Sequence, residues 1–245
     1  MNLSVVIPAF NESESLPGTI VAIDEALAII KINYEILVVN DNSSDNTIQV
    51  LQALTNKIPR LRYITNTSPN GFGYAVRKGL ENYNGDCVAI MMADLSDSPD
   101  DLVKFYNTML ETNCDCVFGS RFIKGAQLYD YPFVKRIVNR LANFIIRLMF
   151  RLSYNDVTNA FKLYKRETID GVKPFIAPHF NLTVELPLKA IIRGYSYRVL
   201  PNSWTNRKYG ESKLKLREMG SRYFFILLYC LIEKYFSKGD FHKKW

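Results

Sequence analysis

The chain has 245 residues, of which 48% are hydrophobic and 22% charged, the composition of a globular protein with one large core or two small ones. The four cysteines lack the spacing of a disulfide framework, the first residues lack a cleavable signal pattern, and no window approaches about 18 uninterrupted apolar residues. We therefore expect a cytoplasmic chain without a conventional transmembrane helix. The net charge of +7 predicts an anionic partner: nucleic acid, an acidic lipid surface or a phosphorylated small molecule.

Short runs of β-branched residues alternate with helical patterns over the first 120 residues. The runs predict buried strands at 3–7, 35–39, 61–64, 87–91 and 116–118. Apolar residues recur at helical spacing in 16–30 and 102–110. This β-α-β series predicts an α/β fold with a mostly parallel sheet covered by helices on both faces.

Polar clusters follow three of the predicted strands, at Asn11-Glu12, at 41–45 and at 94–97. Ligands bind at the carboxyl ends of parallel strands, so these clusters predict a site. Taken singly, each could instead cap the helix that follows it. Together, carboxylates on one sheet edge favour a ligand or cation. The glycine-rich stretch 71–76 is only a weak dinucleotide-binding signal, because the first strand ends without a glycine loop.

A basic amphipathic helix is predicted at 134–152, where four arginines form a narrow stripe beside an apolar face. Two interpretations are open. The helix either docks at a membrane interface or packs on its own domain with solvated arginines. An aromatic stretch at 223–229 could complete a membrane-facing surface or contact another subunit.

Eight segments in order resemble the motifs of family 2 glycosyltransferases, and most closely the polyprenyl-phosphate (dolichyl-phosphate mannose synthase-like) branch. They are VVIPAFNESESL at 5–16, VVNDNSSDNT at 38–47, GFGYAVRKGL at 71–80, MMADLSDSP at 91–99, GSRF at 119–122, TNAFKLYKRE at 158–167, VELPLKAIIRGY at 184–195 and NRKYGESKL at 206–214. The resemblance implies a GT-A fold, a nucleoside diphosphate sugar as donor, Mg²⁺ or Mn²⁺ as cofactor, and inversion at the anomeric carbon.

The chemistry of the motif residues predicts how such a donor is held. Asp94 is expected to bind the metal and take part in catalysis, with Asp97 as a second ligand if its loop folds back. The phosphate groups are expected to meet three cations, which are Arg121, Arg207 and Lys213. The nucleotide and its sugar are expected to meet the remaining site residues, namely Pro8 and Phe10 as an apolar wall, Glu12 and Asp41 as acceptors, and Ser96.

Two departures from the family pattern bear on this site. The metal motif, usually Asp-x-Asp, reads Met92-Ala93-Asp94, so metal affinity is expected to be weak. The second strand ends in Asn40-Asp41, where paired aspartates are common. Fewer carboxylates at this edge leave the identity of the nucleotide open.

The sequence predicts a glycosyltransferase domain at 1–213 and a helical extension at 214–245. The expected enzyme moves a hexose to a polyprenyl phosphate while peripherally associated with an anionic membrane. The alternatives are transfer to another membrane-linked glycan and a catalytically silent nucleotide-sugar-binding protein. Binding to nucleic acid is disfavoured because the basic stripe is interleaved with Leu, Ile and Phe rather than forming a docking motif. The oligomeric state is left open.

Overall fold

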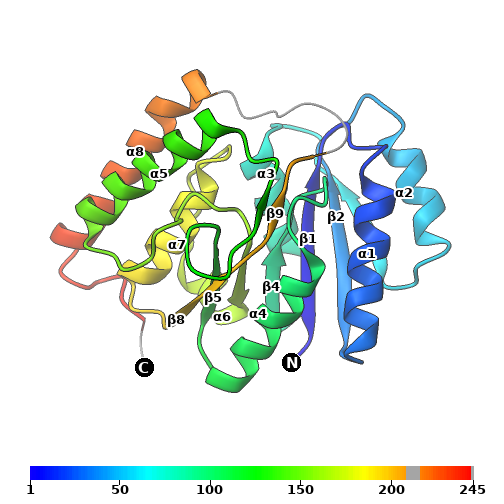
Figure 1. Ribbon diagram of the computed structural model, residues 1–245, viewed down its shortest axis with the longest axis horizontal. Helices are drawn as coiled ribbons and strands as arrows, with labels where there is room; N and C mark the ends of the chain where they lie inside the picture. Colours follow the sequence, from blue (N-terminus) through cyan, green and yellow to red (C-terminus); the bar gives the residue numbers. More distant parts are fainter. Residues whose placement is uncertain (208–215, 244–245) are drawn as a thin grey trace.

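The computed structural model describes residues 1–207 and 216–243, which form a sheet flanked by helices (Figure 1). The strands of the main sheet are β1 Leu3–Ala9, β2 Tyr34–Asn40, β3 Leu61–Thr65, β4 Cys87–Ile90, β5 Cys116–Ser120, β7 Lys162–Lys165 and β8 Tyr197–Pro201. A small parallel sheet pairs β6 Leu128–Tyr129 with β9 Trp204–Thr205. The helices are α1 Leu16–Ile29, α2 Thr47–Thr55, α3 Phe72–Asn82, α4 Pro99–Thr112, α5 Phe133–Phe150, α6 Arg166–Gly171, α7 Leu182–Ile192 and α8 Leu216–Phe236.

The main sheet has the strand order β3-β2-β1-β4-β7-β5-β8. All neighbours are parallel except the pairs that β7 makes with β4 and β5. The mostly parallel sheet predicted from the sequence is therefore confirmed. The chain winds outward from β1 to β3 and then returns to place β4 on the other side of β1. This reversal makes the carboxyl ends of β1 and β4 the topological switch point of the sheet, and ligands bind in the crevice at such a point in folds of this kind.

Alternating strand residues feed two hydrophobic cores, one on each face of the sheet. Along β1, Leu3, Val5 and Ile7 face the core formed with α1, α2 and α4. Val6, between them, faces the opposite core, which contains residues of α3, α5, α6, α7 and α8. Burial on both faces explains why the strands are continuous apolar runs without alternating polar residues.

The basic amphipathic helix predicted at 134–152 exists as α5 Phe133–Phe150. Only a narrow side of it is buried, through Asn143, Ile146 and Phe150. Most of its apolar stripe faces solvent, including Leu141 at 59% and Leu148 at 73% exposure. The helix therefore packs on its own domain only through this narrow side, and most of the predicted apolar face stays exposed.

The C-terminal helix α8 lies beside α5 and packs on α7 (Figure 1). A buried ion pair joins Arg193, just after α7, to Glu233 of α8, with Nε–Oε1 at 2.7 Å and Nη2–Oε2 at 2.8 Å. Lys243 extends the attachment by bonding to both carboxylate oxygens of Asp115 at 3.0 Å. The predicted helical extension is thus present and fastened to the main body. The exact boundary proposed at 213/214 falls on residues outside the described part and stays a prediction.

Candidate active site

Arg207 joins two loops at the crevice between β1 and β4. Its Nη2 lies 2.6 Å from Oδ2 of Asp94 in the loop after β4. Its Nη1 lies 3.7 Å from Oε1 of Glu12 in the loop after β1. All three side chains are at most 16% exposed, so the charges interact more strongly than on an open surface. The structure therefore brings together three residues that the sequence predicted for this site.

The loop after β4 is shaped by its own carboxylates and by β9. The backbone N–H of Ser96 donates to Oδ1 of Asp94 at 3.1 Å, and the N–H of Thr205 donates to the carbonyl of Ser96 at 2.9 Å. Asp97 pairs through its backbone with Trp204, and its side chain is buried. Burial, reinforced by the negative charge of Asp94, raises the pKa of Asp97 to about 7. These backbone contacts of β9 thus place Arg207 beside the loop that contains Asp94.

Asp41, expected to meet the nucleotide, organises a neighbouring loop. Its Oδ2 accepts the backbone N–H of Gly71 at 2.7 Å, and its Oδ1 accepts the amides of Asn66 at 2.7 Å and Asn70 at 3.2 Å. Gly71 has φ +143°, and a Cβ there would lie 2.6 Å from Nδ1 of His179. These bonds fix the entry to α3 next to the crevice, so Asp41 shapes the loop in addition to any contact with a ligand.

The two residues of the expected apolar wall differ in exposure. Pro8 is buried within β1, whereas Phe10 follows the strand and is 41% exposed. An exposed aromatic ring at the mouth of a crevice is available to stack on a base. Phe10 can therefore form the wall directly, while Pro8 supports the strand beneath it.

Arg121, expected to contact phosphate, is held by Asp156. Its Nε and Nη2 lie 2.8 and 2.7 Å from the two carboxylate oxygens, and both residues are buried. Although burial disfavours the charge, Asp156 keeps the pKa of Arg121 above its usual value. Its Nη1 donates to the hydroxyl of Tyr131 at 3.3 Å. In this structure most of the guanidinium is engaged by protein groups, which makes Arg121 an anchor of the site.

Lys135 is a candidate phosphate-binding residue that the sequence reasoning missed. It lies in the first turn of α5, with Nζ 4.8 Å from the ring centre of Trp204 and 5.6 Å from that of Tyr131. Burial, then the charges of Arg121 and Arg207, lower the pKa of Lys135, whereas Asp94 opposes the shift. Among the described side chains, which are those of residues 1–207 and 220–243, its ammonium has no hydrogen-bond or ion-pair partner. The sequence places Lys135 near the start of the predicted helix, but the interpretation of that helix rested on its four arginines.

Lys213, the last predicted cation, lies outside the described residues. Its predicted role toward the phosphate groups therefore stays a prediction.

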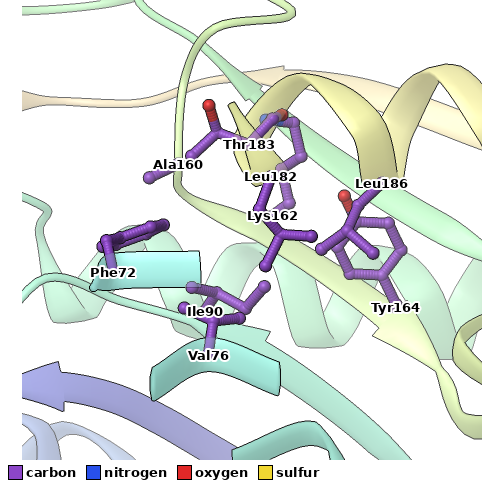
Figure 2. A pocket seen from close by; sticks show the side chains of 9 residues that line it. All are labelled: Phe72, Val76, Ile90, Ala160, Lys162, Tyr164, Leu182, Thr183 and Leu186. Atoms are coloured by element: carbon purple, nitrogen blue, oxygen red, sulfur yellow. The ribbon is translucent and has the colours of Figure 1, made fainter. Parts of the chain in front are cut away.

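The enclosed space beneath the crevice is too small to be the site. Figure 2 shows side chains from α3, β4, β7 and α7 converging on it, and its volume is about 10 Å³. Ligand pockets usually measure some 300 Å³ or more, so this space holds at most one water molecule. A larger hollow of about 310 Å³ lies at the opposite edge of the sheet, beside Asn2, Tyr34 and Asn84. The carboxyl ends of β1 and β4 remain the candidate site, because Arg207 joins the loops that carry Glu12 and Asp94 there.

The residues present fit a divalent cation only in part. Among the described residues no group of three or more His, Cys, Asp or Glu side chains could hold a metal ion. Asp94 offers one oxygen toward Arg207 and uses the other to accept the N–H of Ser96. Magnesium is commonly bound by one or two carboxylates together with substrate phosphates and water. Asp94 therefore suits a cation whose coordination is completed by a bound diphosphate.

Comparison with known proteins identifies the family. The model of glycosyl transferase family 2 matches residues 4–172. The chain belongs to this family. It is 32% identical over 220 residues to a dolichol-phosphate mannosyltransferase of Pyrococcus furiosus, an alignment that covers 88% of this chain and 60% of that relative. A polyprenol monophosphomannose synthase of Mycolicibacterium smegmatis is 27% identical, over 86% of this chain and 80% of the relative. The chain thus spans about three fifths of the Pyrococcus protein.

Solved structures agree on the fold. One is a glucosyl-3-phosphoglycerate synthase from Mycobacterium tuberculosis, solved with Mn²⁺, uridine diphosphate and glucosyl-3-phosphoglycerate. It has a TM-score of 0.68 at 19% identity, and the alignment covers 95% of this chain and 79% of the chain of the synthase. A structure of the same enzyme with Mg²⁺ and uridine diphosphate has a TM-score of 0.66 at 18% identity, over the same shares of the two chains. The GT-A architecture expected from the motifs is confirmed.

Proposed function

We propose that this protein is a glycosyltransferase that moves a hexose from a nucleoside diphosphate sugar to a polyprenyl phosphate. The observation that carries the proposal is the charge arrangement at the crevice. Arg207 contacts Asp94 and Glu12 there, and Lys135 lies within electrostatic reach of both Arg207 and Asp94. Acidic groups for a metal and cations for two sets of phosphates are thereby gathered at one edge of the sheet. The names of the two curated relatives support the same reaction.

The donor is expected to lie along the loops after β1, β2 and β4. Phe10 stacks on the base, Glu12 accepts from a hydroxyl group of the donor, and the diphosphate lies against Arg207. When bound at Asp94, Mg²⁺ or Mn²⁺ neutralises charge on the diphosphate. Arg207 then stabilises the leaving group by charge-assisted hydrogen bonds.

The acceptor phosphate is expected at Lys135, at the start of α5. A helix N-terminus favours anions, and the half-buried ammonium beside Trp204 and Tyr131 adds a full positive charge. One oxygen of this phosphate attacks the anomeric carbon while the bond to the nucleoside diphosphate breaks, which inverts the configuration. A phosphate monoester is already anionic near neutral pH, so this attack needs no strong general base.

The lipid part of the acceptor is expected to follow α5. Apolar side chains run along this helix from its phosphate-binding end, beginning with Phe133 and Val134 and continuing to Leu148, and all three are at least 69% exposed. Exposed phenylalanines of α8, Phe224 and Phe225, extend the apolar area. With the three arginines of α5 and the one that follows its last residue, this surface suits peripheral docking on an anionic membrane. No helix in the described part of the chain is long and apolar enough to cross a bilayer.

Two alternatives have weaker support. Transfer to another membrane-linked glycan would use the same donor site, but a sugar hydroxyl acceptor needs a general base. A silent nucleotide-sugar-binding protein is suggested by Met92, which removes a carboxylate usual at that position. The half-buried Lys135 favours a phosphate acceptor over a sugar hydroxyl, because a second cation beside Arg207 suits a second phosphate group.

A panel of nucleoside diphosphate sugars tests the donor half of the proposal. Each is added with Mg²⁺ and the melting temperature is measured, because a ligand that binds only the folded state raises it. We expect one nucleotide class to stabilise the protein and to be consumed when a polyprenyl phosphate is supplied. Stabilisation without consumption would favour the silent binding protein, and no stabilisation by any donor would contradict the proposal.

A further inference from the structure

The position expected for a metal is bordered by a guanidinium. Nη2 of Arg207 lies 2.6 Å from Oδ2 of Asp94, the oxygen that the backbone of Ser96 does not use. Nη1 of the same group lies 3.7 Å from Glu12. A divalent cation that binds Asp94 through Oδ2 would therefore meet Arg207 at contact distance. Either the two cations repel each other strongly, or one of them moves.

Other charges near Asp94 add to this conflict. Lys135 lies close enough to Arg121, Arg207 and Asp94 for their charges to change its pKa. The family's usual first carboxylate is replaced by Met92, so the negative charge that would compensate a divalent ion is reduced. Arg207 already supplies a positive charge that both Asp94 and Glu12 contact.

We propose that Arg207 is an exchangeable counter-cation, which neutralises Asp94 and Glu12 in the donor-free protein and is displaced by the metal when the donor arrives. This inference rests on the proposed function. The incoming diphosphate supplies the negative charge that both cations need, so Arg207 turns from Asp94 to the phosphate oxygens as the metal binds. Metal and donor thereby bind together, and the site stays closed to metal alone.

The backbone around Arg207 allows such an exchange without unfolding. The residues before it are fixed, since the N–H of Trp204 donates to Gln127 at 2.8 Å and the N–H of Asn206 donates to Tyr129 at 3.1 Å, both to carbonyl oxygens. The movement is therefore assigned to the side chain of Arg207. Its long stem can redirect the guanidinium over several ångströms while β9 stays in place.

The test is a titration of the whole protein with Mn²⁺ alone, followed by electron paramagnetic resonance. Arg207→Gln and Arg207→Met each remove the guanidinium, and the second keeps an apolar stem if the first does not fold. Arg198→Gln is the matched control, because Arg198 is exposed on the edge strand β8 and its removal changes the net charge equally. We expect the Arg207 variants to bind Mn²⁺ at least about tenfold more tightly than the wild type, as like charge is removed at contact distance, and the control to match the wild type.

Unchanged Mn²⁺ affinity in the Arg207 variants, or an equal gain in Arg198→Gln, would overturn the inference. The wild-type protein gives a second readout that needs no variant. The Nε–H resonance of Arg207, followed by NMR, is expected to shift when Mg²⁺ and a nucleoside diphosphate are added together, and a resonance that stays unchanged would also overturn it. Neither measurement depends on turnover. Absence of transferase activity would refute the proposed function, whereas only the Mn²⁺ affinity and the Arg207 resonance decide whether Arg207 is exchanged.

Discussion

Asp94 is the residue on which the proposed metal chemistry depends. One carboxylate oxygen faces Arg207, and the loop holding it is fixed by Ser96 and β9. We predict that Asp94→Asn lowers transfer by at least about 100-fold, because stabilisation of the leaving diphosphate is lost. It should also abolish the mutual strengthening of Mn²⁺ and donor binding, which linkage requires to be reciprocal. Calorimetric titration of Mn²⁺ with and without nucleoside diphosphate measures the coupling, and normal turnover in the variant would contradict the metal role.

Lys135 is expected to hold the acceptor. Lys135→Met should raise the KM for a polyprenyl phosphate by about tenfold or more, since a charge-assisted hydrogen bond to phosphate is lost, while donor binding changes little. Lys57→Met, which makes the same change at an exposed position after α2, serves as the control. Equal acceptor KM values in the Lys135 variant and the wild type would rule out this assignment.

The raised pKa of Asp97 predicts that the free energy of unfolding depends on pH. Its folded-state pKa is about 7, above the ordinary value of 3.8, because it is buried and next to Asp94. Between these values the folded protein holds a proton that the unfolded chain releases, so stability falls as the pH rises from about 4 to 7. Because one proton is involved, the free energy of unfolding changes by at most about 1.4 kcal/mol per pH unit.

Asp97→Asn should remove this contribution, whereas Asp100→Asn at an exposed position should keep it. Urea unfolding of the metal-free proteins between pH 4 and pH 7 makes the comparison. A slope in Asp97→Asn equal to that of the wild type would show that Asp97 does not hold the proton.

At the scale of elements, α5 is both a basic and an apolar helix. The three arginines of the helix and the one that follows its last residue are all exposed, namely Arg136, Arg140, Arg147 and Arg151. Replacing all four by Gln should remove most of the salt-sensitive part of binding to anionic vesicles and leave a weaker, salt-insensitive part from the apolar face. A matched variant replaces four exposed basic residues of the other half of the chain, which are Lys31, Lys57, Arg60 and Lys78. Sedimentation with vesicles measures both, and equal losses in the two variants would mean that only net charge matters.

The elements themselves were largely predictable from the sequence. The five strands expected in the first 120 residues match β1 to β5 within two residues at each end, because continuous apolar runs report burial on both faces of a parallel sheet. The strand β7 was not predicted. Its sequence KLYK contains two lysines, and the burial of Lys162, which donates to three backbone carbonyls, depends on contacts distant in the chain.

The sequence predicted which residues belong to the site, but it did not predict which residues hold them in place. Motif order identified Asp94, Glu12 and Arg207, which the structure brings into contact. The partner of Arg121, Asp156, lies 35 residues further along and carries no local signal. Lys135 was missed for a related reason, since its half-buried place beside Trp204 arises from tertiary packing alone.

At the scale of the whole molecule, the crevice and the exposed apolar face belong to one body. Arg121 lies at the end of β5 and is bound to Asp156, whose carboxylate Asn143 of α5 approaches at 3.5 Å. α8 is fastened through Glu233 to Arg193 and lies against α5. Lys135, in the first turn of α5, is thus held in the same body as the exposed apolar face.

The net charge of +7 is consistent with the proposed function, because both proposed substrates and an anionic membrane surface carry negative charge. The chain matches about three fifths of its Pyrococcus relative, so the reaction proposed for the whole protein needs a direct assay.

That assay supplies the stabilising nucleotide sugar and compares a polyprenyl phosphate with the corresponding unphosphorylated polyprenol as acceptors. We predict a glycosylated lipid phosphate of inverted anomeric configuration from the first and no product from the second, since the phosphate oxygen is the proposed nucleophile. Equal transfer to both lipids, or a product formed only on the free alcohol, would contradict it.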